Sequence, residues 1–334
     1  MRIAAGQLHA EIIRVLTAHG ASAYQADATA RHMVWCESAG RHNFGIERVA
    51  IHVKRLQAGV LNGRAQPVLQ TLSPSLALLD GGGGFGYAAG ERAMMEAIAL
   101  ARASGIGAVG VRNSNFFGAG AFYVNMAAEA GMIGIAMSNS FPKVVAHGGL
   151  AAVLGTNPFA FGAPRRNGDH LLFDMATSAL AGSTVREHIK KDKALPEGLA
   201  IDSAGRAITD PRKVNDGALL PFGGPKGFGL SLMVEILAGV ITGAGIGEGV
   251  ASMYQDFSRS GDNGHFVLAL DISRFIAIDD YHARFEGLAA ALKASGGNVL
   301  LPGEVRWEKW RDSRDRGVEV NDAQWAVVQT YLSK

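Results

Sequence analysis

The spacing of apolar residues changes along the chain near Pro67. Before that point, segments 1–22, 23–40 and 47–60 place apolar residues about 3.6 positions apart, which predicts amphipathic helices. After it, short apolar runs such as 76–80 end in Gly, Pro or Asn and alternate with longer helical segments. Strands that alternate with helices in this way predict an α/β protein.

Two later stretches differ from this alternation. Residues 186–217 are polar and rich in turn-forming residues, which predicts an excursion from the fold. Residues 228–241 carry Glu235 as their only charge, which predicts a buried helix. The first stretch is therefore expected at the surface and the second in the core.

Composition narrows the class of protein. The 334 residues have a formal net charge of +2 with Lys and Arg scattered along the sequence, so no nucleic-acid surface is expected. No apolar stretch reaches the roughly 18 residues of a membrane span, and the N-terminus lacks the pattern of a signal peptide. The single cysteine, Cys36, lies in an apolar helix, and no Cys/His cluster has metal-site spacing. We expect a cytoplasmic protein without a membrane, nucleic-acid or metal partner, and a buried Cys36.

A glycine-rich turn follows the run 76–80. Gly81, Gly83 and Gly86 fit the G-x-G-x-x-G pattern of a Rossmann nucleotide site between a strand and a helix. The next strand ends at Asn113 without the carboxylate that would hold ribose hydroxyls, and 44 glycines make a chance match easy. A plain strand-to-helix turn is the favoured interpretation.

Six longer strings, in this order and at these separations, resemble the malate/L-lactate dehydrogenase-like family over nearly the whole chain. The strings are ERVAIHVKRLQAG, LGTNPFAFGAP, DMATS, GGPKGFGLSLMVEILAGV, GHFVLALD and LPGE. The family includes ureidoglycolate dehydrogenase, diketogulonate reductase, sulfolactate dehydrogenase and the piperideine/pyrroline-2-carboxylate reductases. The resemblance implies an NAD(P)-dependent oxidoreductase that forms a homodimer, with the active site in a cleft near the subunit boundary.

The resemblance also implies the fold and its organisation. We expect the α/β fold of the malate/sulfolactate dehydrogenase type, in which the cofactor domain is not a Rossmann domain. A helical region over residues 1–75 would pack with the C-terminal part of the chain. Residues 76–270 would form the α/β cofactor-binding domain, and residues 271–334 would return to the N-terminal domain.

Cofactor contacts carry over from the family to matching positions. The expected cofactor-binding residues are Ser140, Gly155, Thr156, Asn157, Asp174, Met175, Ala176, Lys226, Pro302, Gly303 and Glu304. Small residues let backbone N–H groups approach phosphates, a lysine supplies a point charge, and a carboxylate can hold ribose hydroxyls. Structural interpretations also stand: Asn-Pro is a common turn, Asp174 could cap the helix that follows, and Lys226 could be a solvated surface lysine. The choice between NAD and NADP stays open.

The departures from the family fall on the residues that carry its chemistry. The family's Asp-Ser-His-Gly is here the segment 42–45, His-Asn-Phe-Gly, and the family's arginine follows as Arg48. The histidine of its Asn-His-Phe-Gly string is Phe116, and that of its Gly-Gly-His-Lys-Gly string is Pro225. Phenylalanine can neither donate nor accept a proton, so acid–base catalysis of the family's kind is excluded at Phe44 and Phe116.

Three other titratable residues are candidates for the missing proton transfer. His147 stands beside the expected active site, where relatives carry an aromatic residue, and Lys143 lies close to the expected cofactor strand. His42 lies two residues from Phe44. A single histidine is more often structural than catalytic, and His265 is expected to belong to the framework.

These residues predict a function and leave two alternatives. We expect an NAD(P)H-dependent oxidoreductase that acts on a small 2-oxo or cyclic 2-imino carboxylate, because a protonated iminium accepts hydride without an enzymic acid. Arg48 would grip the substrate carboxylate, while Phe44 and Phe116 form an apolar wall with Asn43 beside them. The alternatives are a non-redox lyase or isomerase on the same scaffold, and an inactive homologue that serves as a binding subunit.

Overall fold

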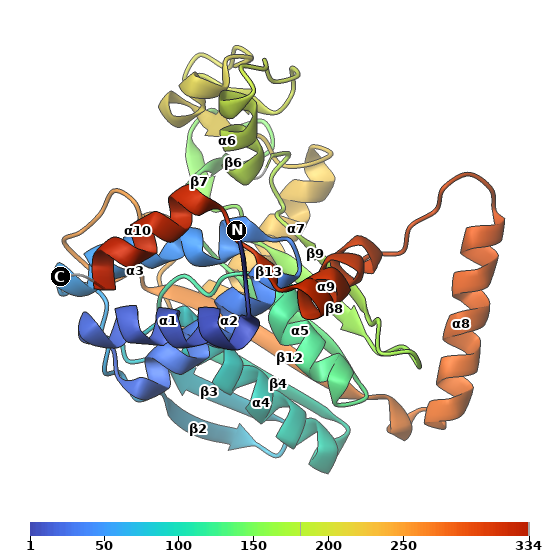
Figure 1. Cartoon of the computed structure of the whole chain (residues 1–334). Coiled ribbons are helices and arrows are strands. Elements are labelled where there is room, and N and C mark those ends of the chain that lie inside the picture. The colour runs from blue at the N-terminus through green and yellow to red at the C-terminus, as the bar shows by residue number, and fades with distance from the viewer. Residues whose placement is uncertain (181, 333–334) are drawn as a thin grey trace.

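A seven-stranded sheet forms the centre of the protein, whose computed structural model describes residues 1–180 and 182–332 (Figure 1). The strand order is β2-β3-β4-β12-β5-β8-β9. The strands are β2 (Val68–Ser73), β3 (Leu76–Asp80), β4 (Ile106–Ser114), β12 (Asn263–Asp271), β5 (Met132–Ser138), β8 (Phe159–Ala163) and β9 (Leu171–Met175). Only β3 and β4 are parallel neighbours in this sheet, and the other adjacent pairs are antiparallel. The predicted α/β class is confirmed, with a sheet that is mostly antiparallel.

Two helices cover one face of this sheet. They are α4 (Gly86–Ser104), which connects the parallel pair, and α5 (Gly120–Glu129). Small apolar side chains of α4, such as Ala93 and Ala97, pack with fully buried sheet residues such as Val109 and Val267. These alanines let the helix lie close to the sheet, and the cluster forms the largest apolar core.

The N-terminal helices lie beside the end of the chain (Figure 1). They are α1 (Ala5–Ala18), α2 (Ala23–Ser38) and α3 (Val49–Gln57), and the C-terminal elements are α9 (Glu304–Arg316), β13 (Val318–Glu319) and α10 (Asp322–Leu332). β1 (Arg2–Ile3) pairs with β13, and residues of both chain ends share one apolar cluster. The sheet itself begins at β2, before the boundary expected at residue 76. Cys36 is buried in α2, as predicted.

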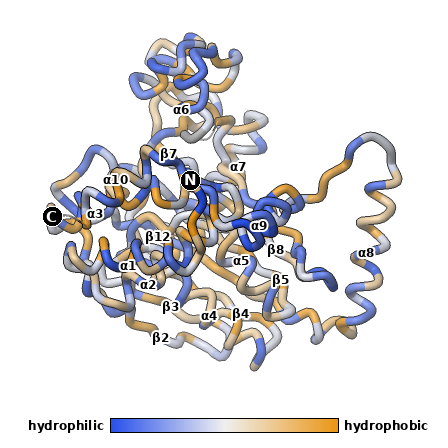
Figure 2. The backbone as a smooth tube through the Cα atoms, viewed as in Figure 1, coloured by the Kyte–Doolittle hydropathy of each residue, from blue (hydrophilic) through white to orange (hydrophobic). Residues whose placement is uncertain are grey.

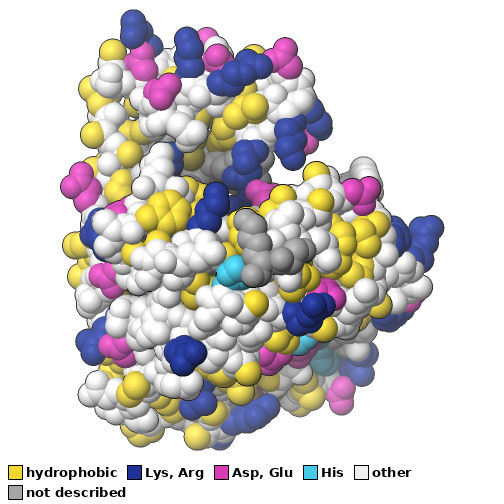
Figure 3. Space-filling view, turned by 60° about the vertical axis from the view of Figure 1, so that its left-hand side comes forward, with side chains coloured by type: hydrophobic (Ala, Val, Ile, Leu, Met, Phe, Trp, Pro, Cys, Tyr) yellow, Lys and Arg dark blue, Asp and Glu magenta, His cyan; other side chains and the backbone are white. Residues whose placement is uncertain are grey.

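A small lobe rises above the main body (Figure 1). Its four-stranded sheet has the order β10-β11-β6-β7. The lobe elements are β6 (Val144–Val145), β7 (Ala152–Leu154), α6 (Gly182–Lys190), β10 (Ala200–Ile201), the 3-10 helix η3 (Pro211–Asp216) and β11 (Ala218–Leu219). The predicted excursion over 186–217 lies in this lobe, and most of its residues are exposed. Leu195, Ile208 and Val214 are nevertheless buried in an apolar cluster, so the excursion has a small core that was not expected. Figure 3 shows the surface hollowed between lobe and body, with Lys and Arg side chains gathered on the lobe and beside the hollow.

The remaining helices leave apolar surface uncovered. α7 (Pro225–Glu235) continues into a π-helical turn over Ile236–Val240. Val234 of this segment is buried, but Ile241, which directly follows it, is 59% exposed. The predicted buried helix is therefore buried on one face only.

α8 (Ile278–Ala294) stands away from the body (Figure 1). α9 is hydrophilic along most of its length (Figure 2). Short 3-10 turns complete the chain: η1 (His42–Phe44), η2 (Ile46–Arg48), η5 (Gly247–Gly249) and η6 (Ile272–Arg274). Within the described part of the chain, no helix has the length and apolar character needed to cross a bilayer.

Candidate active site

A buried carboxylate fixes the path of the loop that precedes Arg48. Glu37, at the end of α2 and 2% exposed, accepts a hydrogen bond from the backbone N–H of Ile46 at 2.8 Å through Oε1. Its Oε2 lies 2.5 Å from Nδ1 of His42, and this contact raises the pKa of His42. A Cβ at Gly45 would collide with the same carboxylate, so a side chain is excluded there. His42 is therefore held by Glu37.

Arg48 is buried among rings and keeps unused donors. The residue is 6% exposed; its Nε donates to the backbone oxygen of Asn43 at 2.7 Å, and Nη1 donates to the hydroxyl of Tyr254 at 2.7 Å. The guanidinium carbon lies 5.8 Å from the ring centre of Phe116 and 5.6 Å from that of Tyr254. A guanidinium has five N–H donors. Two of them are used by these partners, and Nη2 lies 3.9 Å from Oε1 of Glu47, beyond hydrogen-bond distance, so donors remain for a substrate carboxylate.

Phe44 and Phe116 face one another beside this guanidinium. Their rings are nearly parallel, at an angle of 11°, with centres 6.3 Å apart. Phe116 follows β4, where Asn115 fixes the chain through hydrogen bonds to the backbone oxygens of Gly83 and Gly84. Asn43, Phe44, Arg48 and Phe116, the predicted substrate residues, therefore lie together. We call these four residues and Tyr254 the Arg48 cluster.

Tyr254 belongs to a polar loop and was not singled out by the sequence. The loop is fastened by Arg55, which is 1% exposed and donates to the backbone oxygens of Asp256 at 2.8 Å and Arg259 at 3.2 Å. Arg55 and Arg48 lie two turns apart along α3 and its preceding 3-10 turn, so one helical segment positions both the guanidinium and the loop that contacts it. No motif marks Tyr254, because its partner is 206 residues away in the chain.

A buried histidine lies behind Phe116. His52 donates or accepts a hydrogen bond with the hydroxyl of Tyr87 at 3.0 Å, and its ring centre is 6.4 Å from that of Phe116. Burial lowers the pKa of His52 to about 3, and the positive charges of Arg48 and Arg55 act in the same direction. His52 is therefore neutral at physiological pH and packs as part of the wall that supports Phe116.

The predicted cofactor strings meet one another in the structure. Ser140 receives a hydrogen bond at its Oγ from the N–H of Thr156 at 2.9 Å and donates its own N–H to Oδ1 of Asn157 at 3.1 Å. Gly155 packs against Ser140 in the same turn. Asn157 is fully buried and donates to Oε2 of Glu235 in α7 at 2.7 Å. These contacts form a turn, residues 155–157 with Ser140, whose side chains satisfy one another.

β9 connects that turn with the late Pro-Gly-Glu string. Beyond Met175 and Ala176 at the end of β9, the N–H of Thr177 donates to the backbone oxygen of Thr156 at 2.9 Å. At the other end of β9, the N–H of Leu172 donates to the oxygen of Pro302 at 3.0 Å, and Gly303 packs beside it. The predicted residues of three strings thus lie along one strand.

Asp174 lies in β9 and accepts a hydrogen bond from the N–H of Ala121 at 3.1 Å. Ala121 is the second residue of α5, so the carboxylate caps a helix that precedes it in the chain, not the one that follows. Burial raises the pKa of Asp174, and the charge of Arg306 opposes this shift. The carboxyl group thus has a structural partner in the protein.

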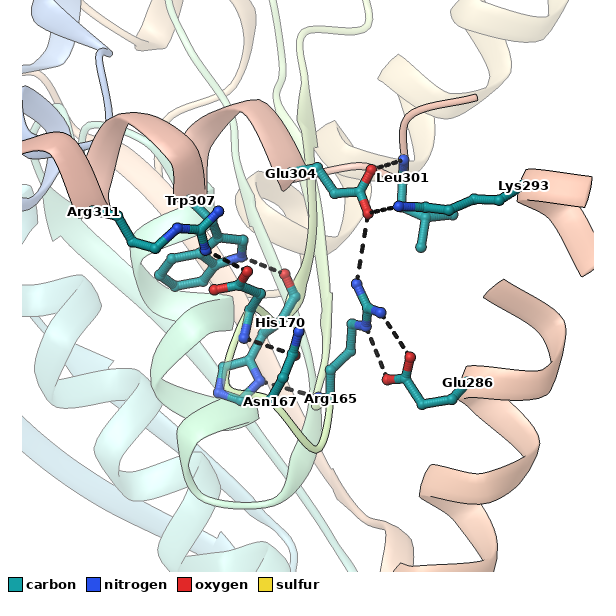
Figure 4. A network of polar contacts seen from close by, with 10 residues as sticks. Arg165, Asn167, His170, Glu286, Lys293, Leu301, Glu304, Trp307 and Arg311 are labelled. Atoms are coloured by element: carbon teal, nitrogen blue, oxygen red, sulfur yellow. Dashed lines mark hydrogen bonds and ion pairs between the residues drawn. The ribbon is translucent and has the colours of Figure 1, made fainter. Parts of the chain in front are cut away.

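Glu304 anchors the late turn through ion pairs (Figure 4). Its Oε1 lies 2.5 Å from Nζ of Lys293, and its Oε2 accepts from the N–H of Leu301 at 3.0 Å. Arg165 lies 3.8 Å from Glu304 and binds Glu286 of α8 through two nitrogens, at 3.0 and 2.7 Å. This network fastens the turn to the middle and the last turn of α8, through Glu286 and Lys293.

Lys143 and His147 lie on the lobe. Nζ of Lys143 donates to Oδ1 of Asn215 at 3.1 Å, and burial lowers the pKa of this lysine. His147 is exposed and lines a hollow of about 690 Å³ together with Phe222 and Gly224. In the described ranges, no hydrogen bond, ion pair or ring contact joins either residue to Arg48 directly.

Two other expectations from the sequence have a structural account. In the turn over 81–86, the N–H of Gly83 donates to the oxygen of Asn113, and a Cβ at Gly86 would collide with the backbone oxygen of Asn115. The start of α4 is thus closely covered by protein, which favours a plain strand-to-helix turn. His265 lies fully buried between the hydroxyl groups of Ser138 and Ser114, as expected of a framework residue.

Comparisons with known proteins agree over the whole chain. Residues 3–329 match the family model described as malate/L-lactate dehydrogenase. An L-sulfolactate dehydrogenase from Methanothermobacter thermautotrophicus is 35% identical, over 96% of this chain and 94% of the relative. A Delta(1)-pyrroline-2-carboxylate reductase from Burkholderia ambifaria is 33% identical, over 98% and 96%. The crystal structure of a delta1-piperideine-2-carboxylate reductase from Pseudomonas syringae pvar. tomato is similar with a TM-score of 0.92 and 32% identity, over 99% of both chains.

Proposed function

Because this chain belongs to the malate/L-lactate dehydrogenase family, we propose that it reduces a small 2-oxo or cyclic 2-imino carboxylate with NADH or NADPH. The relatives compared are dehydrogenases and reductases of small carboxylates, and two of them are named for cyclic imino carboxylates. The observation that carries the proposal is the Arg48 cluster, a buried cation with unused donors between aromatic rings.

The chemistry of the cluster selects the substrate. A planar carboxylate fits the remaining N–H donors of Arg48, which is buried and therefore binds the anion in a low-dielectric setting. The near-parallel rings of Phe44 and Phe116 offer a flat apolar surface to the rest of the substrate. A second carboxylate against these rings would lose its hydration without gaining a partner. The cluster therefore favours a ring or an apolar chain over a dicarboxylate.

The region around β9 and the lobe fits a dinucleotide. The hollow beside His147 is lined by glycines, and a Cβ at Gly148 or Gly223 would meet no atom within 4 Å, so a ligand can approach the backbone closely there. Lys226 lies exposed at the start of α7, where its charge is available to the same ligand. Ser140, the turn 155–157 and Asp174 complete the proposed contacts. When bound, the dihydronicotinamide supplies the hydride.

The source of the proton depends on the substrate. A protonated cyclic iminium needs no acid at the carbon that accepts hydride, whereas a 2-oxo group must receive a proton on oxygen. Lys143 and His147 are the proton donors proposed from the sequence. The relatives reported above are all named as oxidoreductases, so the lyase or isomerase alternative has no support.

Calorimetry and a rate assay test this proposal. We expect NADH or NADPH to bind the purified protein, and its absorbance to fall when a 2-oxo acid or a cyclic 2-imino carboxylate is added. Pyruvate, phenylpyruvate and Δ1-piperideine-2-carboxylate form a suitable first set. Absence of binding by both nucleotides, or of turnover with every substrate, would contradict the proposal.

We also propose that the protein forms a homodimer. α7 and the turn that follows it expose a row of apolar side chains, Leu232, Ile236, Val240 and Ile241, between 41 and 59% exposed. Such a patch on a single chain is typical of an interaction surface. Light scattering at micromolar concentration should give the mass of two chains, and Ile236→Glu with Val240→Glu should shift it toward one. A monomeric wild type would refute the dimer.

A further inference from the structure

We propose that Tyr254 is the acid that protonates the 2-oxo group, a role that replaces the histidines absent at positions 44 and 116. This inference rests on the proposed reductase function and names one more residue for it. It starts from the hydrogen bond between Tyr254 and Arg48, which no sequence motif signals.

The direction of that hydrogen bond leaves the phenolic proton free. A guanidinium only donates, so Nη1 of Arg48 donates to the oxygen of Tyr254 across the 2.7 Å contact. The O–H of Tyr254 must then point to another acceptor. Its ring also lies edge-on to Phe141, with centres 6.1 Å apart. Among the described residues, no hydrogen bond from this hydroxyl to a protein acceptor is found, and it accepts from Arg48.

The position of the phenol follows from the position of the substrate carboxylate. In a 2-oxo acid the carbonyl carbon is bonded directly to the carboxylate carbon. A carboxylate on the free donors of Arg48 therefore brings the C2 oxygen close to any group that binds the same guanidinium. Tyr254 is such a group. Arg55 fixes its loop by donating to the backbone oxygens of Met253 and Asp256, on either side of Tyr254.

The step balances in atoms and charge. As hydride from the reduced nicotinamide adds to C2, the π electron pair of the C2–O bond moves to oxygen, which takes the proton of Tyr254. One O–H bond breaks on tyrosine and one forms on the product. The phenolate that remains accepts a hydrogen bond from Nη1 of the Arg48 cation, and because Tyr254 is 42% exposed it regains a proton from water.

A comparison of two substrate types tests this role. Tyr254→Phe keeps the ring that Arg48 overlies and removes only the hydroxyl. We expect kcat for a 2-oxo acid to fall about 100- to 10,000-fold, the usual effect of a general acid. The rate with Δ1-piperideine-2-carboxylate, at a pH where this imine is protonated, should stay within a few-fold of wild type. Tyr24→Phe is the matched control, since Tyr24 is a surface tyrosine on α2 that is 36% exposed.

Binding provides a readout that does not depend on turnover. Pyrrole-2-carboxylate, a flat carboxylate that cannot be reduced, should bind Tyr254→Phe by calorimetry about as well as wild type. Equal losses with both substrates together with lost binding would show that Tyr254 only positions Arg48. Unchanged reduction of the 2-oxo acid, or a wild type that reduces only the imine, would also overturn the donor role while the proposed reductase stands. A wild type that reduces neither substrate would overturn both.

Discussion

Two polar regions of this protein, the Arg48 cluster and the turn over residues 155–157, are built in opposite ways. In the turn, the polar groups of Ser140, Thr156 and Asn157 bind one another or Glu235, so their hydrogen bonds are satisfied within the fold. In the Arg48 cluster, a buried cation keeps donors unused between aromatic rings. The turn is a completed scaffold, whereas Arg48 keeps N–H donors that make no hydrogen bond within the described residues, with Oε1 of Glu47 3.9 Å from its Nη2.

The two regions also differ in how closely they follow the family's sequence pattern. The turn matches the family's string and supports the shape of the proposed cofactor region. The cluster contains Arg48, where the resemblance places the family's arginine, and Phe44 and Phe116, where the resemblance places the family's histidines. On the proposed function, the residues that differ from the family pattern are those that would select the substrate and transfer the proton, whereas the turn keeps its structural contacts.

The largest effect is expected at the centre of the cluster. Arg48→Ala should lower kcat/KM by about 2–5 kcal/mol, because it removes the buried partner of the substrate carboxylate. Arg92→Ala is a matched control, since Arg92 pairs with Glu96 on the surface of α4 and is 46% exposed. Steady-state rates with the best substrate measure the effect. An Arg48→Ala enzyme with unchanged kcat/KM would show that the carboxylate binds elsewhere.

A smaller loss is expected in the cofactor region. Asp174→Asn keeps an oxygen for the N–H of Ala121 but removes the charge, and it should weaken nucleotide binding by about 1–3 kcal/mol if the carboxylate also holds ribose. Lys226→Ala should weaken binding and flatten its salt dependence, because an exposed charge is screened by salt. Lys190→Ala, an exposed lysine of the lobe, is the control. Calorimetry at two salt concentrations distinguishes these effects. Unaffected nucleotide binding in both variants would show that the cofactor binds elsewhere.

His147 provides a sharper comparison between lobe and cluster. If Tyr254 supplies the proton, His147→Ala should leave the ratio of the 2-oxo acid rate to the imine rate unchanged, even where cofactor binding weakens. The ratio of the two kcat values measures this directly. A selective loss of the 2-oxo rate in His147→Ala would assign the donor role to the lobe.

The smallest effect concerns the loop that carries Phe44. The Glu37 contact raises the pKa of His42 above its unfolded value, so its stabilisation is present below about pH 6.5 and is lost as pH rises through the folded pKa. The ring is half exposed, so we expect roughly 0.2–1 kcal/mol. Chemical denaturation from about pH 5 to 9 brackets the pKa of a histidine. The free energy of unfolding should change less with pH in His42→Gln than in the wild type. An identical pH profile in the variant would contradict this.

The sequence predicted the elements with local periodicity and missed contacts between distant residues. α1 follows from apolar spacing, since Leu8, Ile12 and Val15 fall on one buried face. The core of the lobe did not follow, because its apolar residues are isolated in a polar stretch and come together only through the small sheet.

The candidate site shows the same division. The family resemblance predicted that Asn43, Phe44, Arg48 and Phe116 lie together, because these residues belong to strings whose spacing is recognisable. Tyr254 and Arg55 could not be found this way, since their roles depend on contacts that cross about 200 residues of chain, namely 206 and 201. Folding alone brings these residues together.

The most direct test of the account is the choice between a cyclic monocarboxylate and a dicarboxylate by the wild-type enzyme. The account predicts a higher kcat/KM for Δ1-piperideine-2-carboxylate than for oxaloacetate, because Phe44 and Phe116 give a second carboxylate no partner. Both rates are measured by oxidation of the same reduced nucleotide. Preferred reduction of oxaloacetate, or oxidation of malate at ordinary enzymic rates of about 1–1,000 s⁻¹, would contradict it.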